Sequence, residues 1–242
     1  MTYCVASMMN AGIVFASDSR TNAGVDNIAT FRKMKTFERQ GDRVIVLLNS
    51  GNLAVTQATL NHLDLAIRRE TGPNLMSVGS MYEVAELVGA ALRSVRDHDT
   101  PFLIQSNVDA SANFIVGGQI FGEPQRLFLV YSEGNFIEAT AETPYFQIGE
   151  VKYGKPIIDR VITAETSLND AIKCVLVSFD STMRSNLSVG LPVDLLSYNR
   201  DCLRIGHTWR FDEHDSYMTS LRKSWGEGVR QAFAELPNPD WS

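Results

Sequence analysis

The chain begins with short apolar runs separated by turn-forming residues, a pattern that predicts β-strands. Gly12 and Gly41 lie in two of these turns, between runs that are long enough to pair as hairpins. Residues 43–48 are almost continuously apolar, which is typical of a strand that is buried on both faces. We therefore predict two hairpins, formed by strands at Tyr3–Met9, 12–17, 28–38 and 43–49.

After residue 51 the apolar positions take on a helical spacing. Positions 53, 55, 60, 63 and 67 approximate one helical face between residues 52 and 69, and Gly72-Pro73 supply a stop signal. A second helix is expected over residues 81–95, where one apolar stripe is formed by Val84, Leu87, Val88, Ala91, Leu92 and Val95. The polar residues 97–111 are expected to form a linker.

Strand patterns return after this linker and alternate with further helices. We predict strands at 113–121, 125–132, 136–139 and Tyr145–Gly149, helices at 155–163 and 167–184, a last strand at 203–211 and a last helix at 216–233. Two blocks of strands separated by pairs of helices favour stacked antiparallel sheets between helical layers, which is an α+β fold. One domain over residues 1–242 fits this order better than two, with residues 234–242 as a C-terminal tail.

The composition is that of an ordinary globular protein, with 44% hydrophobic and 21% charged residues. A net charge of −6 argues against nucleic acid or a membrane surface as the main partner. No apolar window approaches the ~18 residues that span a bilayer, and the N-terminus lacks the features of a signal peptide. Cys4, Cys174 and Cys202 are scattered, as expected of reduced thiols, and no histidine pair has a metal-ligand spacing. We therefore expect a cytoplasmic protein that uses no metal or organic cofactor.

Thr2 follows the initiator Met1 and directly precedes the first predicted strand. Its small side chain should allow a methionine aminopeptidase to remove Met1 and leave Thr2 with a free α-amine. A hydroxyl nucleophile and a weak base, with a pKa of roughly 7.7–8.0, would then belong to the same residue. Because many chains begin Met-Thr without any catalytic reason, Thr2 becomes a candidate nucleophile only together with other residues.

Three further positions could supply what a threonine nucleophile needs. Asp18 ends the second strand, either as a turn-former or as a positioned carboxylate. Lys33 and Lys35 share one face of the third strand, where a solvated strand edge is the simpler interpretation. Gly51 lies where a buried strand turns into a helix, so it could serve as a tight connection, as a backbone N–H donor to an oxyanion, or as both.

Together these residues resemble the active-site order of proteasome-type N-terminal-threonine hydrolases. Asp18 follows Thr2 by sixteen residues within Ala16-Ser17-Asp18-Ser19-Arg20, as in that family, and residues 124–135 are similar to the central hairpin of proteasome β subunits. Within this superfamily the chain most resembles the bacterial proteasome-like Anbu family, over residues 18–28, 50–57, 148–156 and 185–194. The resemblance implies the Ntn-hydrolase fold, a four-layer αββα sandwich of two antiparallel sheets flanked by helices.

The chain departs from the proteasome pattern at three places. The family lysine follows the aspartate by sixteen residues, whereas Lys33 and Lys35 follow Asp18 by fifteen and seventeen; the pair Lys33-Met34 fits the family's lysine-aliphatic pattern and favours Lys33. Glu150 stands where proteasome β subunits carry a serine that helps to hold the terminal amine, and its carboxylate would raise the pKa of that amine or of Lys33. Ser188 begins a segment like the family's later Ser-Gly-Gly, but Ser185 stands where the family has aspartate.

The resemblance implies a threonine-type endopeptidase that acts on peptides or unfolded proteins inside a self-compartmentalising homo-oligomer. Thr2 would be the nucleophile, Lys33 and Asp18 would activate it, Gly51 would bind the oxyanion, and Glu150 and Ser188 would support the terminus. Two alternatives stay open: an Ntn amidase acting on a small amide, and a catalytically silent structural subunit. Because a silent subunit has no need of Thr2, Asp18 and Lys33 together, this set argues against the second alternative. The sequence does not identify the form of the assembly or any unfoldase partner.

Overall fold

The computed structural model describes residues 1–22, 28–70 and 72–240, so part of the segment 18–28 lies outside the described residues. One sheet has the strand order β10 (Tyr145–Gly149), β1 (Tyr3–Met9), β2 (Gly12–Asp18), β11 (Val193–Asn199) and β12 (His207–Phe211). The other has the order β5 (Met34–Arg39), β6 (Arg43–Gly51), β7 (Ala112–Ile120), β8 (Arg126–Val130) and β9 (Phe136–Glu138). A small separate hairpin consists of β3 (Arg20–Asn22) and β4 (Ile28–Thr30).

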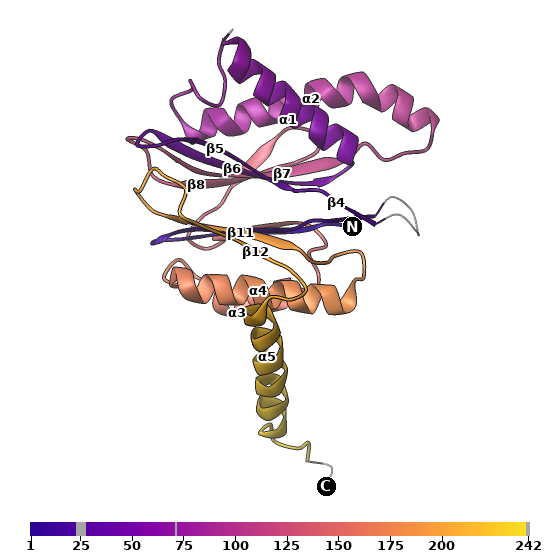
Figure 1. Cartoon of the computed structure of the whole chain (residues 1–242), viewed down its shortest axis with the longest axis vertical. Coiled ribbons are helices and arrows are strands. Elements are labelled where there is room, and N and C mark those ends of the chain that lie inside the picture. The colour runs from indigo at the N-terminus through magenta and orange to yellow at the C-terminus, as the bar shows by residue number, and fades with distance from the viewer. Residues whose placement is uncertain (23–27, 71, 241–242) are drawn as a thin grey trace.

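The two sheets lie face to face between two layers of helices (Figure 1). Above the β5–β9 sheet lie α1 (Leu53–Arg69) and α2 (Met81–Gln105), and below the other sheet lie α3 (Lys155–Val161) and α4 (Leu168–Ser185). The expected α+β fold, with two stacked antiparallel sheets flanked by helices, is confirmed. Because every pairing within the two large sheets is antiparallel, neighbouring strands bring residues from distant parts of the sequence to the same sheet end.

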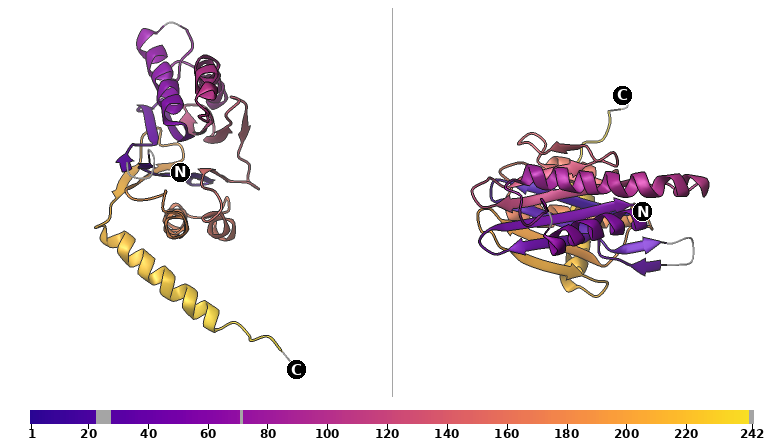
Figure 2. Two further views of the ribbon diagram at one scale, coloured as in Figure 1. Left: turned by 90° about the vertical axis from the view of Figure 1, so that its right-hand side faces the viewer. Right: turned by 90° about the horizontal axis from the view of Figure 1, so that it is seen from above.

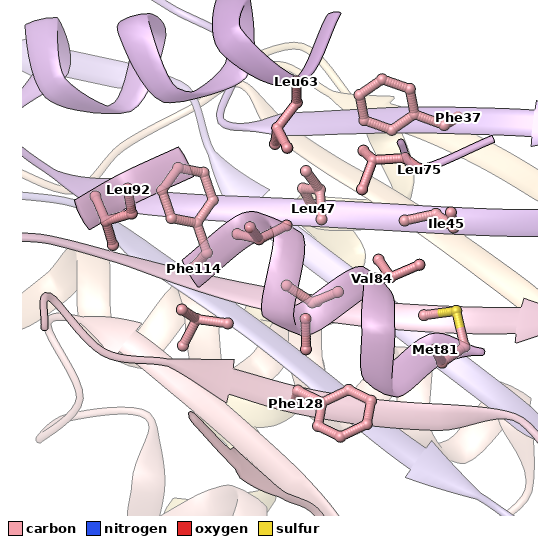
Figure 3. Packing of buried hydrophobic residues seen from close by; sticks show 14 of the residues in the cluster. Phe37, Ile45, Leu47, Leu63, Leu75, Met81, Val84, Leu92, Phe114 and Phe128 are labelled. Atoms are coloured by element: carbon pink, nitrogen blue, oxygen red, sulfur yellow. The ribbon is translucent and has the colours of Figure 1, made fainter. Parts of the chain in front are cut away.

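Three apolar clusters hold the four layers together. The cluster between the upper helices and their sheet is shown in Figure 3, where Leu63 and Val84 reach from the helices toward Leu47 and Phe114 on the strands. A second cluster joins the lower sheet to α3 and α4, and a third fills the space between the two sheets. Strands β1, β2 and β6 contribute side chains to two clusters each, which explains why their sequences are apolar on both faces.

Helix α2 continues through the predicted polar linker. It ends at Gln105 and contains Pro101, so the prediction that the helix stops at Val95 is wrong. The last buried residue of the helix is Val95, and the turns beyond it lie mostly at the surface. A polar stretch therefore forms a solvated helix end here, where the sequence pattern predicts a loop.

Two strand predictions are also corrected by the structure. Strand β11, which the sequence pattern does not predict, lies between β2 and β12, and β12 starts at His207, later than predicted. The predicted single strand at 28–38 is divided into β4 and β5, with residues 31–33 outside any strand. Lys33 lies within this interruption, so the alternation of side chains along a strand does not fix the direction of its side chain.

Helix α5 (Ser216–Ala234) stands away from the rest of the molecule (Figure 2). It begins at its N-cap Asp215 and is fastened by the buried Met218 and by an ion pair between Arg222 and Asp180 of α4. From Lys223 onward nearly all described residues are exposed. Among the described residues, no helix is both long enough and apolar enough to cross a membrane.

Candidate active site

Strand pairing brings the start of the chain to the end of β2. The antiparallel register of β1 and β2 places Cys4 opposite Ser17, so Thr2 and Tyr3 lie beside Asp18. The backbone N–H of Tyr3 donates a hydrogen bond of 3.0 Å to Asp18 Oδ1. The candidate nucleophile and the candidate carboxylate are therefore close in space, although sixteen residues separate them in the sequence.

Lys33 forms a buried ion pair with the same carboxylate. Its ammonium donates to Asp18 Oδ1 at 2.7 Å and to the carbonyl oxygen of Arg20 at 2.6 Å. Only 5% of the Lys33 side chain is exposed, and none of the Asp18 side chain. From β6, the backbone N–H and the side-chain amide of Asn49 both donate to the Lys33 carbonyl at 3.0 Å, which fixes the backbone of the lysine.

Lys35 does not take part in this pair. Its ammonium contacts Asp64 Oδ2 of α1 at 3.1 Å, and 42% of its side chain is exposed. The two lysines do not share a strand face, because Lys33 precedes β5 and lies in the interruption between β4 and β5. Of the two candidates, only Lys33 contacts Asp18.

The electrostatics of the pair depend on its burial. Burial raises the pKa of the Asp18 carboxyl, while the Lys33 ammonium and the Tyr3 N–H oppose that rise. A buried ion pair contributes little net stability, because the cost of removing both charges from water offsets their attraction. The pair is therefore better explained by what it does locally: it holds a cation at a fixed position beside the start of the chain.

The first residues are fixed from the opposite side by β10. The backbone N–H of Glu150 donates to the Thr2 carbonyl at 2.7 Å. Gly149 makes this approach possible, because a Cβ atom at that position would lie 2.0 Å from the Thr2 carbonyl oxygen, and its φ of +85° favours glycine. Thr2 thus lies between β2 and the end of β10, with its carbonyl group held in place.

The Glu150 side chain joins a small polar network below Thr2. Its Oε2 accepts a hydrogen bond of 2.9 Å from the side-chain amide of Asn186, and its Oε1 accepts one of 3.2 Å from the Lys152 N–H. The Asn186 side-chain oxygen in turn accepts from the Ser188 N–H at 3.0 Å. Ser188 is thus part of the network through its backbone.

Two residues of the site carry no clear sequence signal. Asn186 follows Ser185, the position that the family comparison points to, and only the end of α4 directs its amide toward Glu150. Arg20 contributes its carbonyl to Lys33, and its guanidinium donates to the Leu187 carbonyl at 3.0 Å. Its contact with Lys33 could not be predicted from the sequence, because every residue has a backbone carbonyl and no residue type marks this contact.

The terminal amine of the unprocessed chain belongs to Met1 and lies close to these groups. Burial lowers its pKa below the ordinary value of 8.0, and the Lys33 ammonium lowers it further. The carboxylates of Asp18 and Glu150 act in the opposite direction. An amine in this environment is a free base at a lower pH than an ordinary chain terminus.

Gly51 ends β6 at the same side of the sheet as Asn49. Its φ is +106°, and a Cβ atom would lie 2.2 Å from the Ser111 carbonyl oxygen, so the position requires glycine for structural reasons. The next residue, Asn52, caps α1 by accepting from the N–H groups of Ala54 and Val55. The expected strand-to-helix connection is confirmed, and the residue is exposed to solvent.

Cys4 is the other nucleophilic side chain near Thr2. It is fully buried in the cluster between the sheets, and burial raises the pKa of its thiol. A thiol that stays protonated is a poor nucleophile. Cys4 is therefore a core residue.

Solved structures with the same fold identify the family. Anbu (ancestral beta-subunit) from Yersinia bercovieri has a TM-score of 0.94 and 49% sequence identity, over 99% of this chain and 100% of that chain. The chain belongs to the Anbu family of proteasome-like Ntn hydrolases. An Anbu (Gly-1) mutant from Hyphomicrobium sp. strain MC1 has a TM-score of 0.93 and 47% identity, over 99% of this chain and 100% of that chain.

A third Anbu structure, a helical assembly of the complex from Pseudomonas aeruginosa, has a TM-score of 0.94 and 49% identity, over 99% of this chain and 98% of that chain. No protein-family model matches this chain, and no curated protein does. The family expected from the sequence motifs is thus confirmed by solved structures.

Proposed function

We propose that this Anbu protein is a threonine-type endopeptidase whose nucleophile is Thr2, freed by the removal of Met1. The observation that carries the proposal is the buried Lys33–Asp18 pair, which shares Asp18 Oδ1 with the N–H of the residue after Thr2. A fixed cation at this place favours the ionised form of a nearby hydroxyl. Such a pair costs desolvation free energy, so its presence is better explained by chemistry than by stability.

The proposed reaction needs only groups of this chain and water. The α-amine of Thr2 takes the proton of the Thr2 hydroxyl, and the oxygen attacks a peptide carbonyl. Lys33 stabilises the developing alkoxide, and Asp18 holds Lys33 in position through the hydrogen bond between them. The Gly51 N–H donates to the tetrahedral oxyanion, a contribution worth about 2.7–4 kcal/mol in other hydrolases. The α-ammonium returns its proton to the leaving amine as the peptide C–N bond breaks, which leaves an acyl ester on Thr2. Water then hydrolyses this ester, releases the carboxylic acid and restores the Thr2 hydroxyl, while Glu150 and Ser188 support the terminus.

The deciding experiment combines the state of the terminus with a nucleophile variant. Mass spectrometry of the native chain should show that Met1 is lost, and a panel of fluorogenic peptides should be hydrolysed. Thr2→Ala should abolish turnover, whereas Thr2→Ser should retain part of it. Retention of Met1 would rule out the free-amine mechanism, and unchanged turnover by Thr2→Ala would rule out the peptidase. Cleavage restricted to small amides would support an Ntn amidase, and no cleavage at all would support a structural subunit.

We further infer that the chain, as one catalytic domain, works as a self-compartmentalising homo-oligomer in the cytoplasm. The Anbu complex from Pseudomonas aeruginosa forms a helical assembly, and α5 of this chain offers apolar side chains that nothing in the described part of the chain covers. The three cysteines are free thiols, as expected in a reducing compartment. The substrate would be a peptide or an unfolded protein delivered to the enclosed site, with or without an unfoldase.

A further inference from the structure

Glu150 is a buried carboxylate that forms no ion pair with a side chain of the described residues. The residue is only 8% exposed, and no lysine, arginine or histidine of the described chain forms an ion pair with it. Burying an unpaired carboxylate is costly unless hydrogen bonds or a positive charge stabilise it. A positively charged group is therefore expected beside this carboxylate.

The carboxylate is held in a fixed orientation by two uncharged donors. Asn186 donates from its side-chain amide to Oε2 at 2.9 Å, and Lys152 donates from its backbone N–H to Oε1 at 3.2 Å. Asn186 is itself oriented, because its own side-chain oxygen accepts from the Ser188 N–H. These donors fix the orientation of the carboxylate, and neither of them carries a charge that would neutralise it.

The start of the chain brings a positive charge into the range of the Glu150 carboxylate. The backbone N–H of Glu150 donates to the Thr2 carbonyl oxygen at 2.7 Å. The backbone nitrogen of Thr2 belongs to the same residue, three covalent bonds from that oxygen. The Met1 sulfur lies 3.9 Å from the side-chain nitrogen of Asn186, so the Met1 side chain occupies the space beside this pair. Removal of Met1 vacates that space and turns the Thr2 nitrogen into an amine.

We propose that Glu150, oriented by Asn186, is the counter-ion of the α-ammonium group that Thr2 carries once Met1 is removed. This inference rests on the proposed function for its biological meaning, but the ion pair can be tested without any turnover. Glu150 is then a positioning residue: it holds the ammonium form of the terminus and decides at which pH the free base appears.

The protonation of the terminal amine depends on four charged or titratable groups. They are the α-amine itself, Lys33 between β4 and β5, Asp18 at the end of β2 and Glu150 after β10; the segment after α4 faces the site with the uncharged Asn186 and Ser188. In the unprocessed chain, Lys33 favours the neutral form of the Met1 amine and the two carboxylates favour its ammonium form, and we expect the same directions for the Thr2 amine. Asp18 is already paired with Lys33 through Oδ1, although its Oδ2 is buried and has no hydrogen-bond partner in the described structure. Glu150 is the second carboxylate that acts on the amine, and no lysine forms an ion pair with it in the described chain.

The experiment measures the amine directly in full-length protein. The chain is expressed behind a cleavable ubiquitin so that Thr2 is the first residue in every sample, whatever the cell does with Met1. Acylation of the Thr2 amine by acetic anhydride is followed against pH by mass spectrometry of the N-terminal peptide. Four chains are compared: the unsubstituted protein, Glu150→Gln, Asn186→Ala and the control Glu142→Gln, which removes an exposed carboxylate.

Loss of the counter-ion should make the amine a free base at lower pH. Glu150→Gln is expected to raise the acylation rate near neutral pH by about threefold to tenfold, and Asn186→Ala by a smaller factor in the same direction. Glu142→Gln should match the unsubstituted protein. An amine in Glu150→Gln that titrates like the control overturns the proposal; if that variant does not fold, an unchanged amine in Asn186→Ala does so. The outcome of Thr2→Ala on peptide hydrolysis stays separate, because it tests the reaction and not the ion pair.

Discussion

At the scale of single residues, the site depends on one carboxylate oxygen that accepts two hydrogen bonds. Asp18 Oδ1 receives the Lys33 ammonium and the Tyr3 N–H, so the position of the lysine and the position of the first strand are coupled through one atom. Any change to Lys33 should therefore affect both the chemistry and the stability of the chain. The surface pair formed by Lys35 and Asp64 offers a comparison within the same strand region.

Lys33→Met should abolish peptide hydrolysis and destabilise the fold. The substitution removes the cation and leaves Asp18 buried without its partner, which typically costs about 3–5 kcal/mol in free energy of unfolding. The double variant Asp18→Asn with Lys33→Met should recover part of that stability but none of the activity. Urea unfolding and peptide turnover measure the two effects. The control Lys35→Met should change stability by less than ~1 kcal/mol and leave turnover intact, and the reverse pattern would assign the catalytic role to Lys35.

The pH dependence of turnover should report the lowered pKa of the terminal amine. Burial and Lys33 lower the pKa of the Met1 amine below 8.0, and we expect them to act on the Thr2 amine in the same direction once Met1 is removed. A protonated amine cannot accept the hydroxyl proton, so turnover should fall as the pH drops through the lowered pKa. The midpoint of the acid side of the kcat/KM profile should therefore lie below pH 8.0. A midpoint at or above that value would show that the amine is not the base or that its surroundings differ once Met1 is removed.

At the scale of elements, the site lies where strands end and the chain changes direction. Gly51 at the end of β6 and Gly149 at the end of β10 both have positive φ, and both are closely approached by backbone from a neighbouring segment. Gly149 lets Glu150 reach Thr2, and Gly51 lets β6 pass into α1 beside Ser111. Both glycines thus combine tight packing with a position at the edge of the site.

Gly51→Ala should destabilise the chain more than a comparable change at an open turn. The new methyl group would lie 2.2 Å from the Ser111 carbonyl oxygen, so the end of β6 and the start of α1 would have to shift. Gly41→Ala is the matched control, because its φ is +79° and nothing lies within 4 Å of the added carbon. The control should lose about 1–2 kcal/mol from backbone strain alone, and Gly51→Ala clearly more, in urea unfolding. Equal losses would show that the backbone near Ser111 adapts freely.

The elements that the sequence predicts well are those whose apolar pattern is local. Strands β1, β2 and β6 and helix α1 follow from short periodic runs, and the fold class follows from their order. Strand β11 is missed because its place between β2 and β12 depends on partners, one of them far away in the sequence. The end of α2 is misjudged because residues beyond Val95 bury little, so their apolar pattern carries no information.

The same distinction applies to the candidate site. Asp18 and Gly51 can be picked out because each stands at the end of a clear strand, and their places agree with that expectation. The choice between Lys33 and Lys35 cannot be made from strand parity, because the chain leaves the strand conformation at residues 31–33. Asn186 and Arg20 contribute through a capping position and a backbone carbonyl, and neither contribution depends on a motif.

At the scale of the whole molecule, the four layers bury most large apolar side chains, and the exposed ones are spread over several segments. The most prominent of these is α5, which leaves the body after Arg222 (Figure 2). Trp225, Val229 and Phe233 follow one another at four-residue spacing, so they lie along one side of the helix, and all three are exposed. An exposed apolar stripe of this kind is typical of a contact surface, and we expect it to contact a second copy of the chain.

The double variant Trp225→Glu with Phe233→Glu should weaken the assembly without unfolding the subunit. The side chains are 40% and 75% exposed and lie beyond the part of α5 that is anchored by Met218, so the four-layer core does not depend on them. In an assembly, each buried aromatic side chain would contribute about 1.5–3 kcal/mol, which the introduced carboxylates would remove. Sedimentation velocity should therefore show smaller particles, while circular dichroism stays unchanged.

Phe121→Glu is the control, because Phe121 is 71% exposed in the turn after β7, and it should leave the particle size as it is. An unchanged particle in the double variant would mean that copies of this chain associate through other surfaces than α5.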